Sequence, residues 1–297
     1  MTTLMNNKNL LNLALLLVVA ALALIIYQSE EPGTELDRIS NINFDYELAD
    51  ITSLVIEHNG RRTKLEKNAD NQWQITEPVS IAANNFRINS ILKLANAPIH
   101  NRYPISELDA GKIGLRRSAA SSSVEKSSER STSTTIVSFG DTVLRFGIIN
   151  PATNLRYIQI GETVYTIEDV YYPLLSSHFG TLVSLGLLPE DSTIDKLVLI
   201  NQTISKDDNG RWQSNIDISA DAIAATLEGW KTFQAFGIHE YMQRDQLGEV
   251  FVYLKGKEKP ISFQITDTAP WLILARPELG LEYHLDIEAY DKLIAPQ

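Results

Sequence analysis

Cysteine is absent from the whole 297-residue chain. Without a thiol the protein can form no disulfide, use no thiolate nucleophile and build no cysteine-ligated zinc site. A bacterial lipoprotein carries its lipid on a cysteine, so that class of anchored protein is also excluded. Basic residues are in the minority, because 26 Lys and Arg stand against 37 Asp and Glu, for a net charge of −11. This charge argues against nucleic-acid binding and against close docking on anionic lipid.

Long apolar runs are scarce as well, and the one exception is LLNLALLLVVAALALII at residues 10–26. As a helix this run would be about 26 Å long, close to the roughly 30 Å of bilayer hydrocarbon. We therefore predict a transmembrane anchor over residues 10–27. A cleaved signal peptide is the alternative, because Ala21-Leu22-Ala23 has the small-x-small pattern of a cleavage site. Cleavage there would leave an apolar stub, which favours the retained anchor.

Charge gives the expected orientation of this anchor. Lys8 precedes the run, whereas Glu30 and Glu31 follow it, and positive residues stay on the cytoplasmic side. We expect residues 1–9 to form a cytoplasmic tail. The bulk of the chain is then periplasmic, and the protein is a single-pass component of the bacterial inner membrane.

A polar tether and a first folded segment follow the anchor. Residues 28–48 are polar with an early Pro-Gly pair, which is typical of a tether. The first lobe is predicted over residues 49–188. Its expected strands are 51–56, 62–67 and 72–75, followed by a helix over 83–95 whose apolar face carries Phe86, Ile88, Ile91, Leu92 and Leu94.

The same order of elements returns in a second lobe, predicted over residues 189–297. A strand at 194–199, a turn and tryptophan strand at 207–213 and a helix at 219–233 repeat the first pattern. Four short strands and a helical segment then close each copy. The strands are expected at 136–139, 143–146, 156–160 and 164–167, and at 250–254, 261–265, 271–275 and 282–285, with the helical segments at 168–175 and 287–294. The fold class is therefore α+β: a transmembrane helix and two tandem, similar lobes of antiparallel sheet with packed helices.

Only the first copy is interrupted, by RRSAASSSVEKSSERSTST at residues 116–134. Serine and threonine dominate this insert, and it has too little apolar surface to offset the entropy of ordering. We predict a flexible surface loop. A binding loop that orders on a partner is the alternative.

Several of these segments resemble a known family. The segments ITSLVIEHNG, DNQWQITEPV, ISELDAGKIGL and FGDTVLRFGIINPATNLRYIQIGETVYTI, placed after an N-terminal anchor, are similar to the DUF4340 family of bacterial membrane-associated proteins. The likeness covers residues 51–187, is weaker in the second half, and is broken by the serine-rich insert. Its signature residues are Trp73, Glu77, Pro78, Gly114 and Leu115, with glycine-marked hairpins at Gly140, Gly147 and Gly161. The resemblance implies an anchored extracytoplasmic module, and some members are associated with ABC-type exporters.

No pattern in the sequence predicts a catalytic, cofactor-binding or metal-binding residue. The five histidines stand far apart and form neither an i, i+4 pair nor an HExxH motif, although His239 and Glu240 could join a distant carboxylate: His58, His100, His178, His239 and His284. Ser90 with Lys93, and Ser123 with Lys126, match S-x-x-K but lack the partner motifs of that nucleophile.

Two further patterns are interpreted as structural. Asp207-Asp208-Asn209-Gly210 lacks the alternating oxygens of a calcium loop and is predicted to be a type I′ hairpin turn. Trp73 and Trp212 recur at equivalent places, so each is expected to pack between the sheet and the following helix of its own lobe.

These observations favour a non-enzymatic extracytoplasmic interaction or scaffold module, anchored in the membrane and auxiliary to a transport or envelope complex. Its expected partners are the membrane and a protein of that complex, which the family resemblance suggests is an ABC-type transporter. We expect no cofactor. The alternative is a periplasmic protein that binds a small molecule, lipid or glycan between the lobes, which requires a sizeable interlobe pocket.

Overall fold

The computed structural model describes residues 19, 41–42, 48–115 and 135–296 of the chain. Within these ranges no helix is both long and apolar enough to cross a membrane. Almost all of the predicted anchor and tether, and the whole serine-rich insert, lie outside the described residues. The assignments made for those segments therefore stay predictions.

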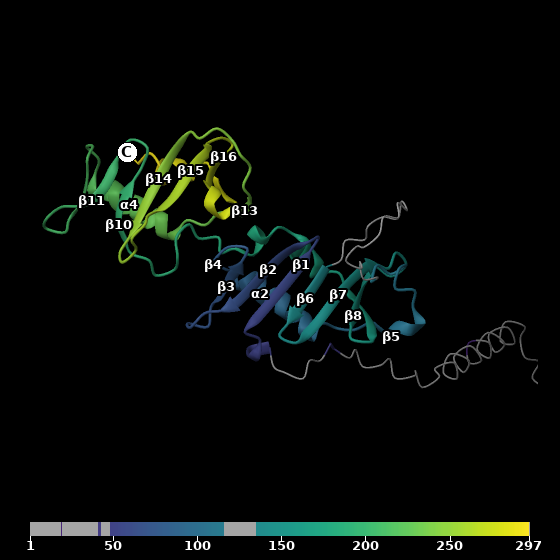
Figure 1. The fold of residues 1–297 in the computed structure, drawn as a ribbon. Helices are drawn as coiled ribbons and strands as arrows, with labels where there is room; N and C mark the ends of the chain where they lie inside the picture. The colour runs from purple at the N-terminus through teal and green to yellow at the C-terminus, as the bar shows by residue number, and fades with distance from the viewer. Residues whose placement is uncertain (1–18, 20–40, 43–47, 116–134, 297) are drawn as a thin grey trace, which may run out of the picture.

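The first lobe is a nine-stranded antiparallel sheet in the order β4-β3-β2-β1-β6-β7-β8-β9-β5 (Figure 1). Its strands are β1 (Ser53–His58), β2 (Arg61–Lys67), β3 (Trp73–Glu77), β4 (Ile81–Ala82), β5 (Asn101–Pro104), β6 (Thr135–Phe139), β7 (Thr142–Ile149), β8 (Leu155–Ile160) and β9 (Thr163–Glu168). Its helices are η1 (Leu48–Asp50), α2 (Asn85–Leu92), η2 (Lys93–Asn96), η3 (Ile105–Glu107), α3 (Tyr172–Ser176) and η4 (Phe179–Leu182).

The second lobe is an eight-stranded antiparallel sheet in the order β12-β11-β10-β14-β15-β16-β17-β13. Its strands are β10 (Ile194–Val198), β11 (Thr203–Lys206), β12 (Trp212–Ser214), β13 (Gly237–Glu240), β14 (Gly248–Leu254), β15 (Ile261–Asp267), β16 (Trp271–Arg276) and β17 (Leu281–Asp286). Its helices are α4 (Ala220–Thr232), η5 (Pro277–Leu279) and α5 (Glu288–Leu293).

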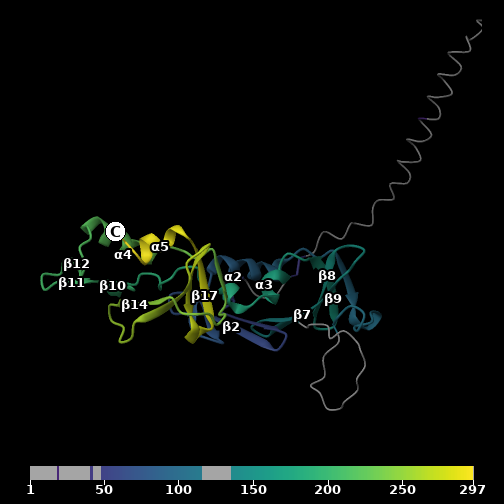
Figure 2. The same ribbon diagram turned by 90° about the horizontal axis from the view of Figure 1, so that it is seen from above.

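The two sheets have one topology, which confirms the predicted pair of similar antiparallel α+β lobes. Removing β4 from the first order leaves β3-β2-β1-β6-β7-β8-β9-β5, which matches the second order strand for strand. In each lobe the tryptophan strand precedes the main helix, and a short helix closes the unit. Figure 2 shows α2 and α3 along one face of the first sheet and α4 and α5 along one face of the second. Each lobe therefore buries one sheet face under helices.

The same pattern of side-chain to backbone hydrogen bonds closes the hairpin before each tryptophan. Asn68 Oδ1 accepts the N–H groups of residues 70 and 72, and Asp207 Oδ1 accepts those of residues 209 and 211. Asn71 and Gly210 have positive φ values of 61° and 78°. Asn209 is not among the residues with positive φ, so the predicted type I′ turn is wrong. An Asx turn that ends in a left-handed residue forms instead, because the side-chain acceptor at its first position holds the loop.

Each main helix begins at a residue whose side chain caps it. Asn84 accepts the N–H of Arg87 at the start of α2, and Ser219 accepts that of Ala222 at the start of α4. The predicted apolar face of the first helix is correct except for Phe86, which is 80% exposed. Phe86 lies two residues before Ile88, on the side of α2 opposite to the buried residues.

The two tryptophans differ in burial although they are topological counterparts. Trp73 is 4% exposed and belongs to the core, whereas Trp212 is only partly buried against it. Each ring has a lysine directly across the hairpin, with Lys67 Nζ 5.5 Å from the Trp73 ring and Lys206 Nζ 5.1 Å from the Trp212 ring. The prediction of equal core packing is therefore confirmed for Trp73 and corrected for Trp212.

The prediction that Gly147 marks a hairpin turn is wrong. Gly140 and Gly161 occupy tight turns with positive φ, as predicted for hairpins. Gly147 instead lies inside β7, where a Cβ atom would stand 2.3 Å from the carbonyl oxygen of Ile113. A close approach of two backbones, and not a turn, requires glycine there.

Candidate functional site: the seam between the lobes and the open face of the second sheet

A short extended segment joins the lobes through backbone hydrogen bonds on both of its sides. Residues 182–186 run between the end of β4 and the segment that follows α4. Asn84 N–H donates to Leu182 O at 2.7 Å, and Ala235 N–H donates to Leu185 O at 2.9 Å. The segment thus extends the edge of the first sheet while it pairs with the second lobe.

A second contact between the lobes lies just before this segment in the chain. Gly180 in η4 approaches the edge strand β13 so closely that a Cβ atom on it would stand 3.1 Å from Ile238 O and 3.1 Å from a methyl group of Leu281. Helix η4 therefore covers the outer edge of β13. The absence of a side chain at residue 180 allows this close packing.

A cleft of about 670 Å³ opens between the lobes beside this seam. Its polar lining combines amides, charges of both signs and hydroxyl groups, among them Asn68, Asn85, Glu190, Lys257 and Arg276. Gln72 Nε2 donates to Glu190 Oε2 at 3.2 Å, which links the rim of β3 to the start of the second lobe.

Aromatic groups contribute little open surface to this cleft. Trp73 and Tyr283 line it, but they are 4% and 1% exposed. The cleft therefore offers hydrogen bonds and charge to a ligand and lacks an exposed ring face on which a sugar could stack. A small, charged, polar molecule fits this chemistry better than a lipid.

The open face of the second sheet carries a different feature, a cluster of four rings that we call the aromatic–histidine cluster: Phe236, His239, Trp271 and His284. Ring centroids lie 5.6 Å apart for Phe236–Trp271, 6.2 Å for Trp271–His284 and 4.6 Å for His239–His284. Phe236 and Trp271 remain 48% and 46% exposed.

Sheet register explains why these rings meet. Trp271 pairs with Asp286, and its neighbour two residues on pairs with His284, so Trp271 and His284 share one face. Tyr283 faces the opposite way and packs on Phe263, which in turn packs on Trp230 of α4. The cluster therefore lies on the face that the helices leave open.

A buried carboxylate supports the cluster. Glu282 is 1% exposed, and its two oxygens accept hydrogen bonds from both terminal nitrogens of Arg244 at 2.8 and 3.1 Å. His284 Nε2 lies 2.8 Å from the same carboxylate, and Met242 N–H donates to it at 3.2 Å. Burial alone would raise the pKa of Glu282, but the hydrogen bonds from Arg244, His284 and Met242 outweigh burial and hold this pKa below its ordinary value.

The fold brings three of the five histidines to this region. His178 caps η4, where its Nδ1 accepts the N–H of Gly180 at 3.2 Å. Burial is the first cause that lowers the pKa of His178, and of His239, below the ordinary histidine value. The charge of His284 lowers the pKa of His239 further. His58 on β1 lines a small pocket together with His178, and its Nδ1 lies 2.7 Å from Thr135 Oγ1.

Neither of the other candidate chemistries gains support from the described residues. No group of three or more potential ligands there could hold a metal ion, so the possible site at His239 and Glu240 does not form in this part of the chain. Ser90 Oγ donates to Phe86 O at 2.9 Å, which is the usual helical back-bond of a serine. Ser123 and Lys126 lie outside the described residues.

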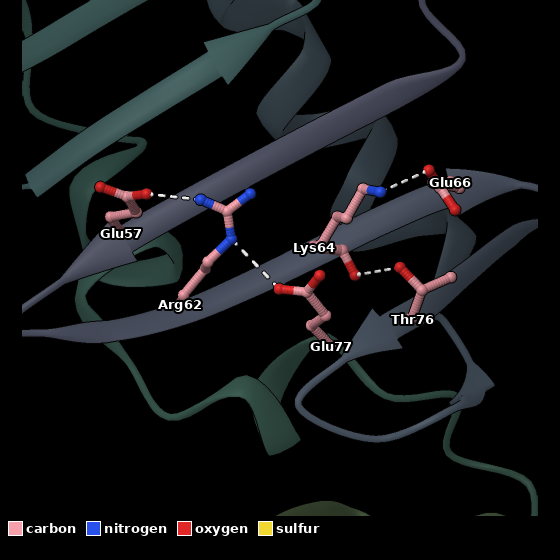
Figure 3. A network of polar contacts seen from close by, with 6 residues as sticks. All are labelled: Glu57, Arg62, Lys64, Glu66, Thr76 and Glu77. Carbon is pink, nitrogen blue, oxygen red and sulfur yellow. Dashed lines mark hydrogen bonds and ion pairs between the residues drawn. The ribbon is translucent and has the colours of Figure 1, made fainter.

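The open face of the first sheet carries ion pairs around β2 (Figure 3), whereas the open face of the second sheet carries the aromatic–histidine cluster. Arg62 on β2 donates to Glu57 at 2.8 Å and to Glu77 at 3.1 Å, and Lys64 lies 2.8 Å from Glu66. These side chains are between a third and a half exposed, so their ion pairs add little stability. This face is a solvated surface.

Comparison of the chain with protein-family models, with curated proteins and with solved structures finds no match. The resemblance to the DUF4340 family consequently stays a prediction. The sequence pattern missed the aromatic–histidine cluster, because His239, Trp271 and His284 come from three strands whose pairing is not visible in the sequence, and Phe236 lies just before one of these strands. The alternation in Glu282-Tyr283-His284 was the one available signal.

Proposed function

We propose that this protein is a non-enzymatic extracytoplasmic interaction module, held at the inner membrane by residues 10–27 and auxiliary to a transport or envelope complex. The observation that carries the proposal is the aromatic–histidine cluster on the open face of the second sheet. Half-exposed Phe236 and Trp271 stand next to each other there, with ring centroids 5.6 Å apart. Contact surfaces between proteins are enriched in such rings.

Two properties of the cluster suit a docking surface. Its rings pack on one another, so little side-chain entropy is lost when a partner covers them. The bidentate pair of Arg244 and Glu282 beneath them fixes the position of His284. The open face of the first sheet carries ion pairs at β2 in place of a ring cluster, so the second lobe is the proposed contact unit and the first lobe links it toward the membrane.

Site-specific photo-crosslinking in intact cells tests this function. A photoreactive phenylalanine analogue at residue 236 or 271 is expected to capture one membrane-complex protein in high yield. The same analogue at Val143, which is 39% exposed on the first sheet, is the matched control and is expected to capture little. Equal capture from all three positions, or none from residues 236 and 271, would contradict the proposal.

The interlobe cleft supports a second candidate function, the binding of a small polar ligand. Its volume of about 670 Å³ lies within the range of ligand pockets, and its lining supplies Lys257, Arg276 and Glu190. The matching test is a thermal-shift screen of small charged metabolites with the full chain. A ligand whose stabilisation disappears in Arg276→Ala and persists in the cluster variant Trp271→Ser would favour this candidate.

A further inference from the structure

The two lobes differ in how they end the sheet beyond the tryptophan strand. In the first lobe the chain turns back after β3 and forms β4, which pairs with Ile75 and Gln74. The outward groups of Trp73 are satisfied as well, because its carbonyl accepts Ala83 N–H at 3.0 Å and its N–H donates to Asn85 Oδ1 at 3.2 Å. The interlobe segment then pairs with the outer side of β4.

The second lobe lacks a counterpart of β4 because its connection is shorter. Eleven residues lead from Trp73 to the helix cap Asn84, but only seven lead from Trp212 to the cap Ser219. Seven residues suffice to enter α4 and are too few for a return strand. Strand β12 therefore remains the edge of its sheet.

Register shows which backbone groups this edge exposes. Asp207 N–H donates to Arg211 O and Asn215 N–H donates to Thr203 O, so these pairs face β11. In an antiparallel ladder the alternate residues face outward, and here they are Trp212 and Ser214. Within the part of the chain that the structure describes, no hydrogen bond is made to the backbone N–H or C=O of either residue.

Each of the other three sheet edges has some protection. Strand β4 is paired on both sides, and η4 covers β13. At β5 the hydrogen bond from Ile105 N–H to Glu162 O places Arg102 and Pro104 outward, and Pro104 has no N–H to donate. Strand β12 is thus the one edge, among those described, that presents unpaired donors and acceptors without such protection.

We infer that β12 is a docking edge for an extended segment of a partner protein, which adds to the second sheet antiparallel to Trp212–Ser214 as β4 adds to β3 in the first. The inference rests on the proposed interaction function and names its mode of contact. Pairing of this kind supplies affinity through backbone hydrogen bonds and would cover the open side of Trp212.

Charge around the edge selects the partner. Asp208 precedes β12, Asp217 follows it and Asp221 lies in the first turn of α4, and all three are exposed without an ion pair within the described residues. Arg211 is engaged with Asp207 at 3.4 Å. A second copy of this chain would bring the same aspartates together, whereas a strand flanked by Lys or Arg would be attracted. The expected occupant is therefore a basic extended segment of another protein.

The experiment uses the full chain in nanodiscs of neutral lipid and a ten-residue peptide of alternating lysine and valine. We expect the peptide to bind and to slow hydrogen exchange at the amides of Trp212 and Ser214. Ser214→Pro removes an outward donor while it leaves the ladder to β11 intact, and should weaken binding about tenfold. Ser214→Ala, which keeps the N–H, is the matched control and should bind as the wild type does.

A second variant covers the case in which Ser214→Pro does not fold. Asp208→Lys combined with Asp217→Lys changes two exposed side chains without ion pairs, and should transfer the preference to a peptide of alternating glutamate and valine. Equal binding by Ser214→Pro and Ser214→Ala, a failure of either peptide to protect β12, or a wild-type dimer that Ser214→Pro makes monomeric would each overturn the inference. Capture from residue 271 in cells reports separately on the proposed function, so it can survive a failure at β12.

Discussion

The two lobes share one strand order but differ at the sheet edge beyond the tryptophan strand. The main hairpins, the capped helices and the order of eight strands recur, down to the lysine that lies over each tryptophan ring. The connection between the tryptophan and the helix cap is four residues longer in the first lobe than in the second. The longer connection includes β4, which covers the outer side of β3. A small change in connection length thus converts a covered edge into an open one. The predictions below test this contrast.

Truncation of the two tryptophans should separate the lobes most strongly. Trp73→Ala empties a closed core site and is expected to cost about 3 to 5 kcal/mol of unfolding free energy. Trp212→Ala removes a partly exposed ring and is expected to cost about 1 to 2 kcal/mol. Urea denaturation followed by circular dichroism measures both values. Equal costs would show that the site of the Trp212 ring is as closed as that of the Trp73 ring.

Loss of Arg244 tests the carboxylate that supports the aromatic–histidine cluster. Arg244→Ala leaves Glu282 buried with its charge uncompensated, which is expected to cost about 2 to 3 kcal/mol because the arginine itself is a quarter exposed. The double variant with Glu282→Gln should recover part of this loss. A double variant no more stable than Arg244→Ala would contradict the assigned role of the pair.

Substitution of Gly180 tests the contact between η4 and β13. A methyl group would stand 3.1 Å from Ile238 O, so Gly180→Ala should destabilise the protein by about 1 kcal/mol. The matched control is Gly161→Ala, which meets open space but has a positive φ of 56°. Limited proteolysis should cut the interlobe segment faster in the first variant only.

Acid should weaken the region where η4 meets β13 through two histidines whose pKa is lowered by desolvation, His178 and His239. The pKa of His178 and that of His239 are lowered in the folded state, so the unfolded chain takes up protons first as pH falls below about 6.5. Stability is therefore complete above that pH and declines toward the folded pKa values. His178→Asn keeps a cap acceptor and removes one titrating group, so melting temperatures measured from pH 7.5 to 5 should decline less steeply. An unchanged slope would exclude His178 from this effect.

The repeated core could be predicted because it rests on local patterns. Alternating apolar residues marked strands such as β1 and β14, and Asn84 and Ser219 precede helices of clear periodicity. These signals depend on neighbours in the sequence. They were sufficient to reveal the duplication.

The edge strands and the candidate site could not be predicted in the same way. Strands β4, β5 and β13 are two to four residues long and take their structure from the strands beside them. Phe236 meets Trp271 only because β13, β17 and β16 are neighbours. Tertiary pairing decides each of these outcomes.

Hydrogen exchange of the backbone amides of the two tryptophan strands in the free full chain tests the central contrast most directly. At β3 the amides of Trp73 and Ile75, which face β4 and α2, are expected to exchange slowly. At β12 the amides of Trp212 and Ser214 should exchange close to the rate of an unprotected peptide, while Gln213 between them is protected by β11. Slow exchange at Trp212 and Ser214, comparable with that at Trp73 and Ile75, would contradict the account.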